Sequence, residues 1–211
     1  MDLVHFLIVQ HFALACLAAV LFFAGAALAG LAVKRGPAFL TRLPLVLFKG
    51  VRRLIGDRPG VPRLVLVIFG FNGTAMFLYM ASGYRPFIPL AIDVLTGFNI
   101  AVILLLAGQE QASGGSAAPA CCRWTPSERL TAVCGVAVLL IELPSFWYSI
   151  AMGVTLGREA LGGQAGYAPA LALRAGVYAR LVLPALLVSA LCEAVAIRGM
   201  QSRMEAPEED F

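Results

Sequence analysis

Charged side chains are scarce in this chain. They make up 13% of its 211 residues, against about 25% in an average soluble domain, while 60% of the residues are hydrophobic. A chain of this length cannot hide so much apolar surface in a water-soluble core, so we expect one membrane domain covering residues 1–211. The apolar runs are continuous rather than alternating, which argues against membrane β-strands and predicts an all-α, polytopic helical bundle.

Motifs that carry chemistry are also lacking. The chain has no CxxC, and no spacing of its cysteines and histidines suits zinc. It contains no GxSxG, HExxH or Walker A sequence. We therefore expect a protein that is not an enzyme, with no catalytic residues, no metal and no cofactor. The net charge of +4 comes from basic residues beside the apolar runs, which favours lipid over nucleic acid as their partner.

Five apolar runs are long enough to cross a bilayer as helices. They cover about residues 3–33, 63–83, 87–108, 127–157 and 171–197. The fourth run is long, so we expect its helix to be tilted, kinked at Pro144 or broken. Two further segments are predicted to be flexible or disordered: a loop rich in Gly, Ser and Ala at 109–126, and an acidic tail at 204–211.

The segment 36–56 differs from the five runs because basic residues interrupt its apolar stretches. This pattern predicts an amphipathic helix that lies in the membrane interface. Pro37 and Pro44 are expected to break its start. Its basic residues, and those just before it, are expected to face lipid headgroups: Lys34, Arg35, Arg42, Lys49, Arg52 and Arg53.

Basic residues also predict the orientation of the chain. Most lysines and arginines fall in or beside segment 36–56, loop 109–126 and the C-terminal end. The positive-inside rule then gives an outside N-terminus, five spans and a cytoplasmic C-terminus. We expect a multi-pass protein of the inner (cytoplasmic) membrane, in contact with other membrane proteins as a hetero- or homo-oligomer.

Glu142 is a carboxylate deep in the fourth run, two residues before Pro144. A rise of 1.5 Å per residue puts it near the bilayer midplane, at the depth of Asn72 and Asn99. No basic residue lies at that depth, so an unpaired carboxylate would be expected in its neutral form. These polar groups either pair with one another and fix the helix register, or line a path for protons or a solute.

Three other ionisable residues are predicted to lie inside the spans. Asp93 and Arg180 fall in the outer half of the bilayer, where they could pair. Glu193 falls toward the inner half, within reach of Arg129 or Arg198. Charged groups in hydrocarbon are costly, so each is a candidate functional residue.

Three stretches of the chain resemble the stage II sporulation protein M family. They are FGFNGTAMFLYMASG at 69–83, IELPSFWYSIAMGVTLG at 141–157 and LVLPALLVSALCEAV at 181–195. The resemblance implies a polytopic membrane fold and singles out the residues that match the family pattern: Asn72, Glu142, Pro144 and Glu193. Family members often carry His-Gly shortly before Glu-Leu-Pro, where this chain has Val138-Leu139. The family's namesake is a scaffold for cell-wall-degrading partners, and some relatives look like permease components that work with an ATPase.

Three functions are compatible with these features. The first is a membrane scaffold or assembly subunit that holds partner proteins. The second is a transport component in which Glu142, Asp93 and Asn99 line a path. The third is a small accessory subunit of a membrane redox complex.

Overall fold

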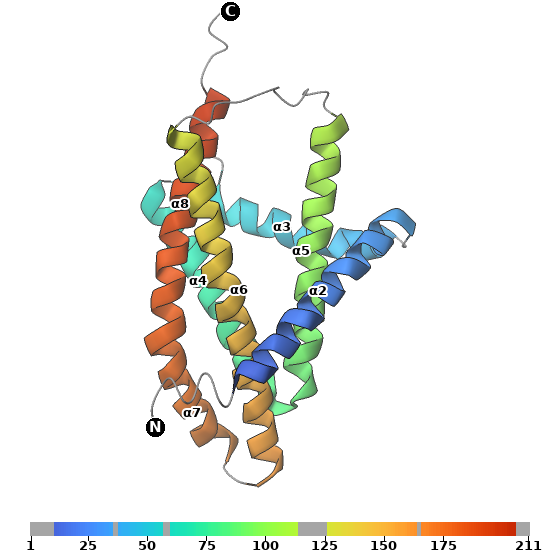
Figure 1. Cartoon of the computed structure of the whole chain (residues 1–211), viewed down its shortest axis with the longest axis vertical. Coiled ribbons are helices and arrows are strands. Elements are labelled where there is room, and N and C mark those ends of the chain that lie inside the picture. The colour runs from blue at the N-terminus through green and yellow to red at the C-terminus, as the bar shows by residue number, and fades with distance from the viewer. Residues whose placement is uncertain (1–10, 36–37, 57–59, 114–125, 164–165, 206–211) are drawn as a thin grey trace, which may run out of the picture.

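The computed structural model describes residues 11–35, 38–56, 60–113, 126–163 and 166–205, and all of its regular elements are helices (Figure 1). The α-helices are α2 (Phe12–Arg35), α3 (Ala38–Ile55), α4 (Val61–Ala81), α5 (Phe87–Ser113), α6 (Pro126–Leu161), α7 (Tyr167–Val177) and α8 (Leu183–Glu205).

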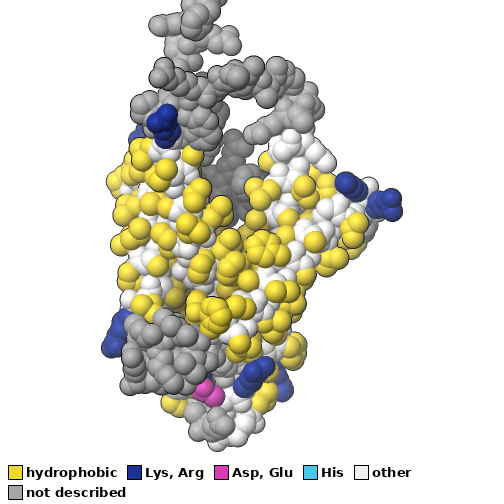
Figure 2. Space-filling model, in the orientation of Figure 1, with side chains coloured by type: hydrophobic (Ala, Val, Ile, Leu, Met, Phe, Trp, Pro, Cys, Tyr) yellow, Lys and Arg dark blue, Asp and Glu magenta, His cyan; other side chains and the backbone are white. Residues whose placement is uncertain are grey.

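Five of the helical segments are long and apolar enough to cross a membrane, which confirms the predicted all-α class and the number of spans. The segments are Phe12–Arg35, Val61–Tyr84, Phe87–Gln109, Arg129–Leu161 and Tyr167–Gly199. Residues 3–10 of the first predicted span lie outside the described part of the chain. Hydrophobic side chains cover the face shown in Figure 2, and the charged side chains visible there lie toward its two ends. Such a surface is suited to lipid.

Helix α3 occupies the predicted interfacial segment and runs across the long axis of the other helices (Figure 1). The side chains of Arg42, Lys49 and Arg53 are exposed, as are Lys34 and Arg35 at the end of α2. The side chain of Arg52 is outside the described set. Pro44 was expected to break the start of this segment, but the structure has it buried inside α3. The helix begins at Ala38, and Pro37 lies outside the described residues.

Helix α6 continues unbroken through Pro144. A proline removes one backbone donor from a helix, which is costly in hydrocarbon unless other groups compensate. The hydroxyl of Ser145 donates to the carbonyl of Ile141 at 2.7 Å, and that of Ser149 donates to the carbonyl of Ser145 at 2.8 Å. These side-chain bonds give the carbonyls of Ile141 and Ser145 an additional donor on either side of the proline, whereas the carbonyl that loses its backbone donor is that of Leu140.

The fifth span is a continuous helix with a π-helical stretch, Tyr178–Val182, between α7 and α8. Pro184 lies two residues beyond it and cannot donate to the carbonyl of Arg180, four residues earlier. A local widening of the helix is a common response to such an interruption.

Several predicted segment boundaries differ from the structure, since α6 continues to Leu161 and α7 begins at Tyr167, where spans were predicted to end at about 157 and to begin at about 171. Helix α5 continues to Ser113, although the flexible loop was predicted to begin at residue 109, and α8 continues to Glu205, although the tail was predicted to begin at 204. Gln, Glu and Ala after Gly108 are good helix formers, which explains the longer α5. The remainder of both segments, residues 114–125 and 206–211, is not described.

The spans form two groups that meet near the turn between α4 and α5. Helices α4, α6, α7 and α8 form a bundle, and α2 packs along α5 beside it (Figure 1). The two groups join where α6 packs against α2 and where it meets η2 (Ser82–Tyr84). A Cβ atom on Gly83 would overlap the backbone of Gly153, so this contact requires glycine. Farther from this turn the α5 and α6 ribbons diverge (Figure 1).

Glycines also set the contact between α2 and α5. A Cβ atom on Gly25 would overlap the carbonyl oxygen of Val94, and one on Gly97 would overlap that of Phe22. Small residues that let two backbones approach are typical of helix pairs in membranes. This reciprocal contact therefore holds α2 and α5 together as one unit.

Candidate intramembrane polar site

Glu142 of α6 accepts hydrogen bonds from two neighbouring helices. Its Oε1 accepts from Nδ2 of Asn72 in α4 at 2.8 Å and from Oγ of Ser189 in α8 at 2.9 Å. Asn72 was predicted to lie at the same depth as Glu142, and the structure brings the two together. We call Glu142, Asn72 and Ser189 the Glu142 cluster.

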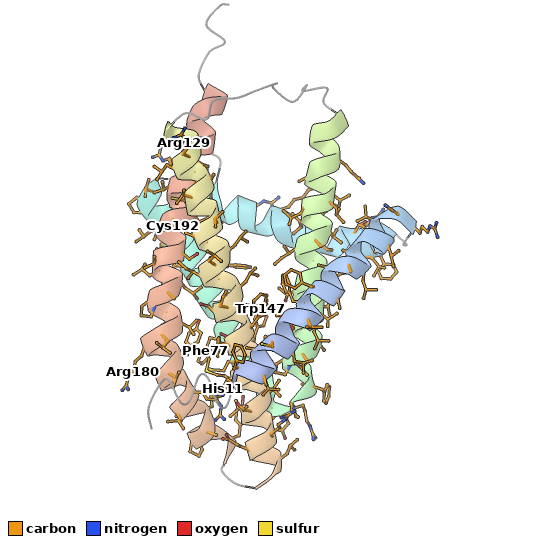
Figure 3. The ribbon with its side chains drawn as sticks, viewed as in Figure 1. His11, Phe77, Arg129, Trp147, Arg180 and Cys192 are labelled. Atoms are coloured by element: carbon orange, nitrogen blue, oxygen red, sulfur yellow. The ribbon has the colours of Figure 1, made fainter. Side chains whose placement is uncertain are left out.

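Ser189 is a member of this cluster that the sequence analysis missed. It is fully buried and lies four residues before Glu193, so the two residues share a face of α8. That spacing from an intramembrane carboxylate is the signal that could have identified it. Glu193 is within Coulombic range of Glu142. Within the described part of the chain it forms no ion pair with Arg129 or Arg198, contrary to expectation. In Figure 3, Arg129 lies near the start of α6, farther along the bundle than Cys192, the neighbour of Glu193 in the sequence.

A cavity of about 250 Å³ lies beside the Glu142 cluster, between α2, α4, α5 and α6. Its polar lining consists of Asn72, Thr96, Asn99 and Glu142. We call it the polar cavity. Asn99, predicted at the depth of Glu142, therefore belongs to the same site. The rest of the lining is apolar or aromatic and includes Phe22, Phe71, Met76, Tyr79, Ile100 and Phe146.

Two groups on the wall of the polar cavity have unused hydrogen-bonding capacity. Both bonds to Glu142 from described residues go to Oε1, which leaves Oε2 without one. The side-chain amide of Asn99 likewise has no hydrogen bond to the described residues. Neither its oxygen nor its nitrogen is fully buried. Both groups are thus open to a molecule in the cavity.

Asp93 lies away from this cavity, and the predicted pair with Arg180 does not form. Asp93 is fully buried, and neither carboxylate oxygen has a hydrogen-bond partner among the residues that the structure describes. Arg180 is exposed, and its side chain points away from the bundle (Figure 3). The two residues were paired by depth alone, and depth does not fix the direction in which a helical residue points.

Among the described residues the buried arginine is Arg174 instead, whose side chain is 2% exposed. Its Nη2 donates to Oε1 of Glu159 at 2.6 Å and to Oγ1 of Thr155 at 3.3 Å, and Nη1 donates to the carbonyl of Ala170 at 3.1 Å. Nε2 of His11 lies 3.1 Å from the same Thr155 hydroxyl. We call these side chains the Arg174 cluster. It links α6 to α7 and to the start of α2.

Pro144, the remaining candidate residue, is exposed and does not line the polar cavity. Among the described residues, no three side chains of His, Cys, Asp and Glu gather in a way that could hold a metal ion.

Comparisons of the chain with models of known protein families, with curated proteins and with solved structures found no match. The resemblance to stage II sporulation protein M therefore stays a prediction. The structure shows a polytopic membrane protein with five candidate spans and a polar site between them.

Proposed function

We propose that this protein is a non-enzymatic scaffold or assembly subunit of a membrane protein complex. The observation that carries the proposal is the Glu142 cluster. The central carboxylate joins α4, α6 and α8 through two hydrogen bonds, and polar contacts of this kind stabilise helix packing in membranes. Three helices joined in this way suit a subunit that positions other proteins.

The surface around this core supports the same proposal. The α5 and α6 ribbons diverge away from the turn between α4 and α5 (Figure 1). Helix α5 exposes Leu104, and α6 exposes Leu139 and Leu140. These faces are available to the spans of partner proteins. Helix α3 adds exposed basic side chains that suit an anionic lipid surface. By the resemblance, the partners would include other membrane proteins and, as for the permease-like relatives, an ATPase. The positive-inside rule gives the orientation in an inner membrane, with the N-terminus outside and the C-terminus cytoplasmic.

Affinity purification from native membranes, followed by mass spectrometry, tests the scaffold. We expect partners in fixed stoichiometry with the chain. The variant Glu142→Gln should retain them, because a glutamine oxygen can still accept from Asn72 and Ser189. The proposal would be contradicted if the chain were recovered alone after mild solubilisation. The cells used for this test should make the protein at its native level.

The polar cavity favours a second function, a transport component. Asn72, Thr96, Asn99 and Glu142 converge on one cavity between spans, as expected for a solute or proton path. Asp93 does not line this cavity, so such a path would use Glu142 and Asn99 without it. Flux measured in proteoliposomes separates the two functions. A transport component should carry a flux of solute or protons that Glu142→Gln abolishes. A scaffold should show no such flux and should keep its partners in this variant.

A further inference from the structure

We propose that the polar cavity binds a lipophilic organic cation, an ammonium carried on a hydrocarbon body, with the ammonium against Glu142. This binding site goes beyond a scaffold, because a scaffold requires no small-molecule ligand.

The lining of the cavity selects for this chemistry. Among the described residues it includes one carboxylate, Glu142, and the side chains of two asparagines, but no lysine, arginine or histidine. The aromatic rings around it belong to Phe22, Phe71, Tyr79 and Phe146. Aromatic faces attract cations, most strongly where water is excluded. A carboxylate among aromatic rings therefore favours a cation over an anion or a neutral solute.

The hydrogen-bonding groups are already positioned for an ammonium. Asn72 and Ser189 hold Oε1 of Glu142, which fixes the carboxylate and leaves Oε2 without a bond to the described residues. The amide oxygen of Asn99 offers a second acceptor from the facing helix. An acyl chain in the same place would leave both groups without a partner, at a cost that a cation avoids.

Size and access point to a ligand that enters from the bilayer. The volume of about 250 Å³ is roughly eight times the ~30 Å³ that one water molecule occupies in the liquid. It can hold an ammonium and the first part of a carbon chain. Two lining residues, Phe71 on α4 and Ile100 on α5, are 53% and 42% exposed on the apolar surface. Helices α4 and α5 make few direct contacts, so the remainder of the ligand's hydrocarbon chain can extend between them into lipid.

Binding of octylammonium to the full-length protein in phosphatidylcholine nanodiscs tests the proposal. Equilibrium dialysis against empty nanodiscs removes the contribution of simple partitioning. We expect one saturable site per chain for octylammonium and at least about tenfold weaker binding of octanol, which has the same chain without the charge. Equal binding of the two compounds would show a lipid crevice and overturn the proposal.

Variants assign the binding to the cavity. Glu142→Gln removes the carboxylate that pairs with the bound ammonium and keeps an acceptor for Asn72 and Ser189, so octylammonium should bind at least about tenfold more weakly. Glu193→Gln is the matched control, because Glu193 lies near Glu142 but does not line the cavity. The affinity of the Glu193→Gln variant for octylammonium should stay within about threefold of the wild-type affinity. Equal effects of the two variants would overturn the assignment.

A second cavity variant decides the outcome if Glu142→Gln fails to fold. Ala75 lines the cavity and has no part in the Glu142 cluster. Ala75→Phe would fill the space from α4 and should abolish saturable binding of octylammonium, whereas unchanged binding would place the ligand elsewhere. Partner recovery in the absence of octylammonium is a separate readout, so failure of this proposal and failure of the scaffold are distinguishable.

Discussion

Glu142 carries two hydrogen bonds whose loss would leave polar groups unpaired in an apolar bundle. Glu142→Ala removes the acceptor for both Asn72 and Ser189, so we expect the free energy of unfolding to fall by about 1–3 kcal/mol. Glu142→Gln keeps an acceptor and should cost less than about 1 kcal/mol. SDS titration in mixed micelles measures both changes. Equal losses in the two variants would mean that the charge, and not the hydrogen bonds, stabilises the fold.

The ion pair in the Arg174 cluster leads to a second prediction. Glu159→Gln leaves the guanidinium of Arg174 buried without a countercharge. Because Glu159 is itself 37% exposed, the expected loss is about 1–2 kcal/mol rather than the larger cost of breaking a fully buried pair. In an Arg174→Met background the same change should have little effect. A double-mutant cycle measures this coupling, and additive losses would contradict it.

At the scale of residues, the sequence predicted how deep a polar residue lies in the membrane, but not the direction in which its side chain points. Asn72, Asn99 and Glu142, which were grouped by depth, do come together, because all three side chains line the polar cavity. The same reasoning failed for Asp93 and Arg180, which point to different surroundings. Arg174 was missed because it lies near the end of its span. Its spacing of four residues from Ala170 and Tyr178, both also buried, was the available signal.

At the scale of helices, the contact between α2 and α5 depends on glycine. Gly97→Ala places a Cβ atom against the carbonyl oxygen of Phe22, so we expect the free energy of unfolding to fall by about 1–3 kcal/mol. Gly108→Ala is the control on the same helix, since a Cβ atom there meets no other atom within 4 Å. It should be neutral, or stabilising by up to about 1 kcal/mol. Similar losses in both variants, again from SDS titration, would show that close packing of α2 on α5 is not required.

The five spans were predictable because each is a long apolar run, and this signal is local. Helix ends were less predictable, as the extension of α5 to Ser113 shows. The contact of α2 with α5 could not be predicted, because Gly25 and Gly97 belong to spans that are not consecutive. Many other glycines in this chain face open space, so glycine alone does not mark a contact.

At the scale of the whole molecule, the positive-inside rule predicts which end faces the cytoplasm. In a cysteine-free background, Tyr84→Cys in the turn between α4 and α5 should react with a membrane-impermeant maleimide in intact cells. Tyr84 is 63% exposed, which makes its position a suitable probe. Lys49→Cys in α3 is also exposed and should react only after permeabilisation. The reverse pattern would invert the orientation and place the basic face of α3 outside.

The π-helical stretch at Tyr178–Val182 has a consequence for the register of the last span. Arg174 lies before it and Ser189 after it, yet both side chains are buried. One residue of an α-helix corresponds to a rotation of about 100°. Deleting a single residue within the stretch would turn α8 by about that angle and move Ser189 away from Glu142, while Arg174 stayed in place. The π-helical stretch therefore sets the rotation of α8 relative to α7. With this rotation, one continuous helical span places Arg174 in the Arg174 cluster and Ser189 in the Glu142 cluster.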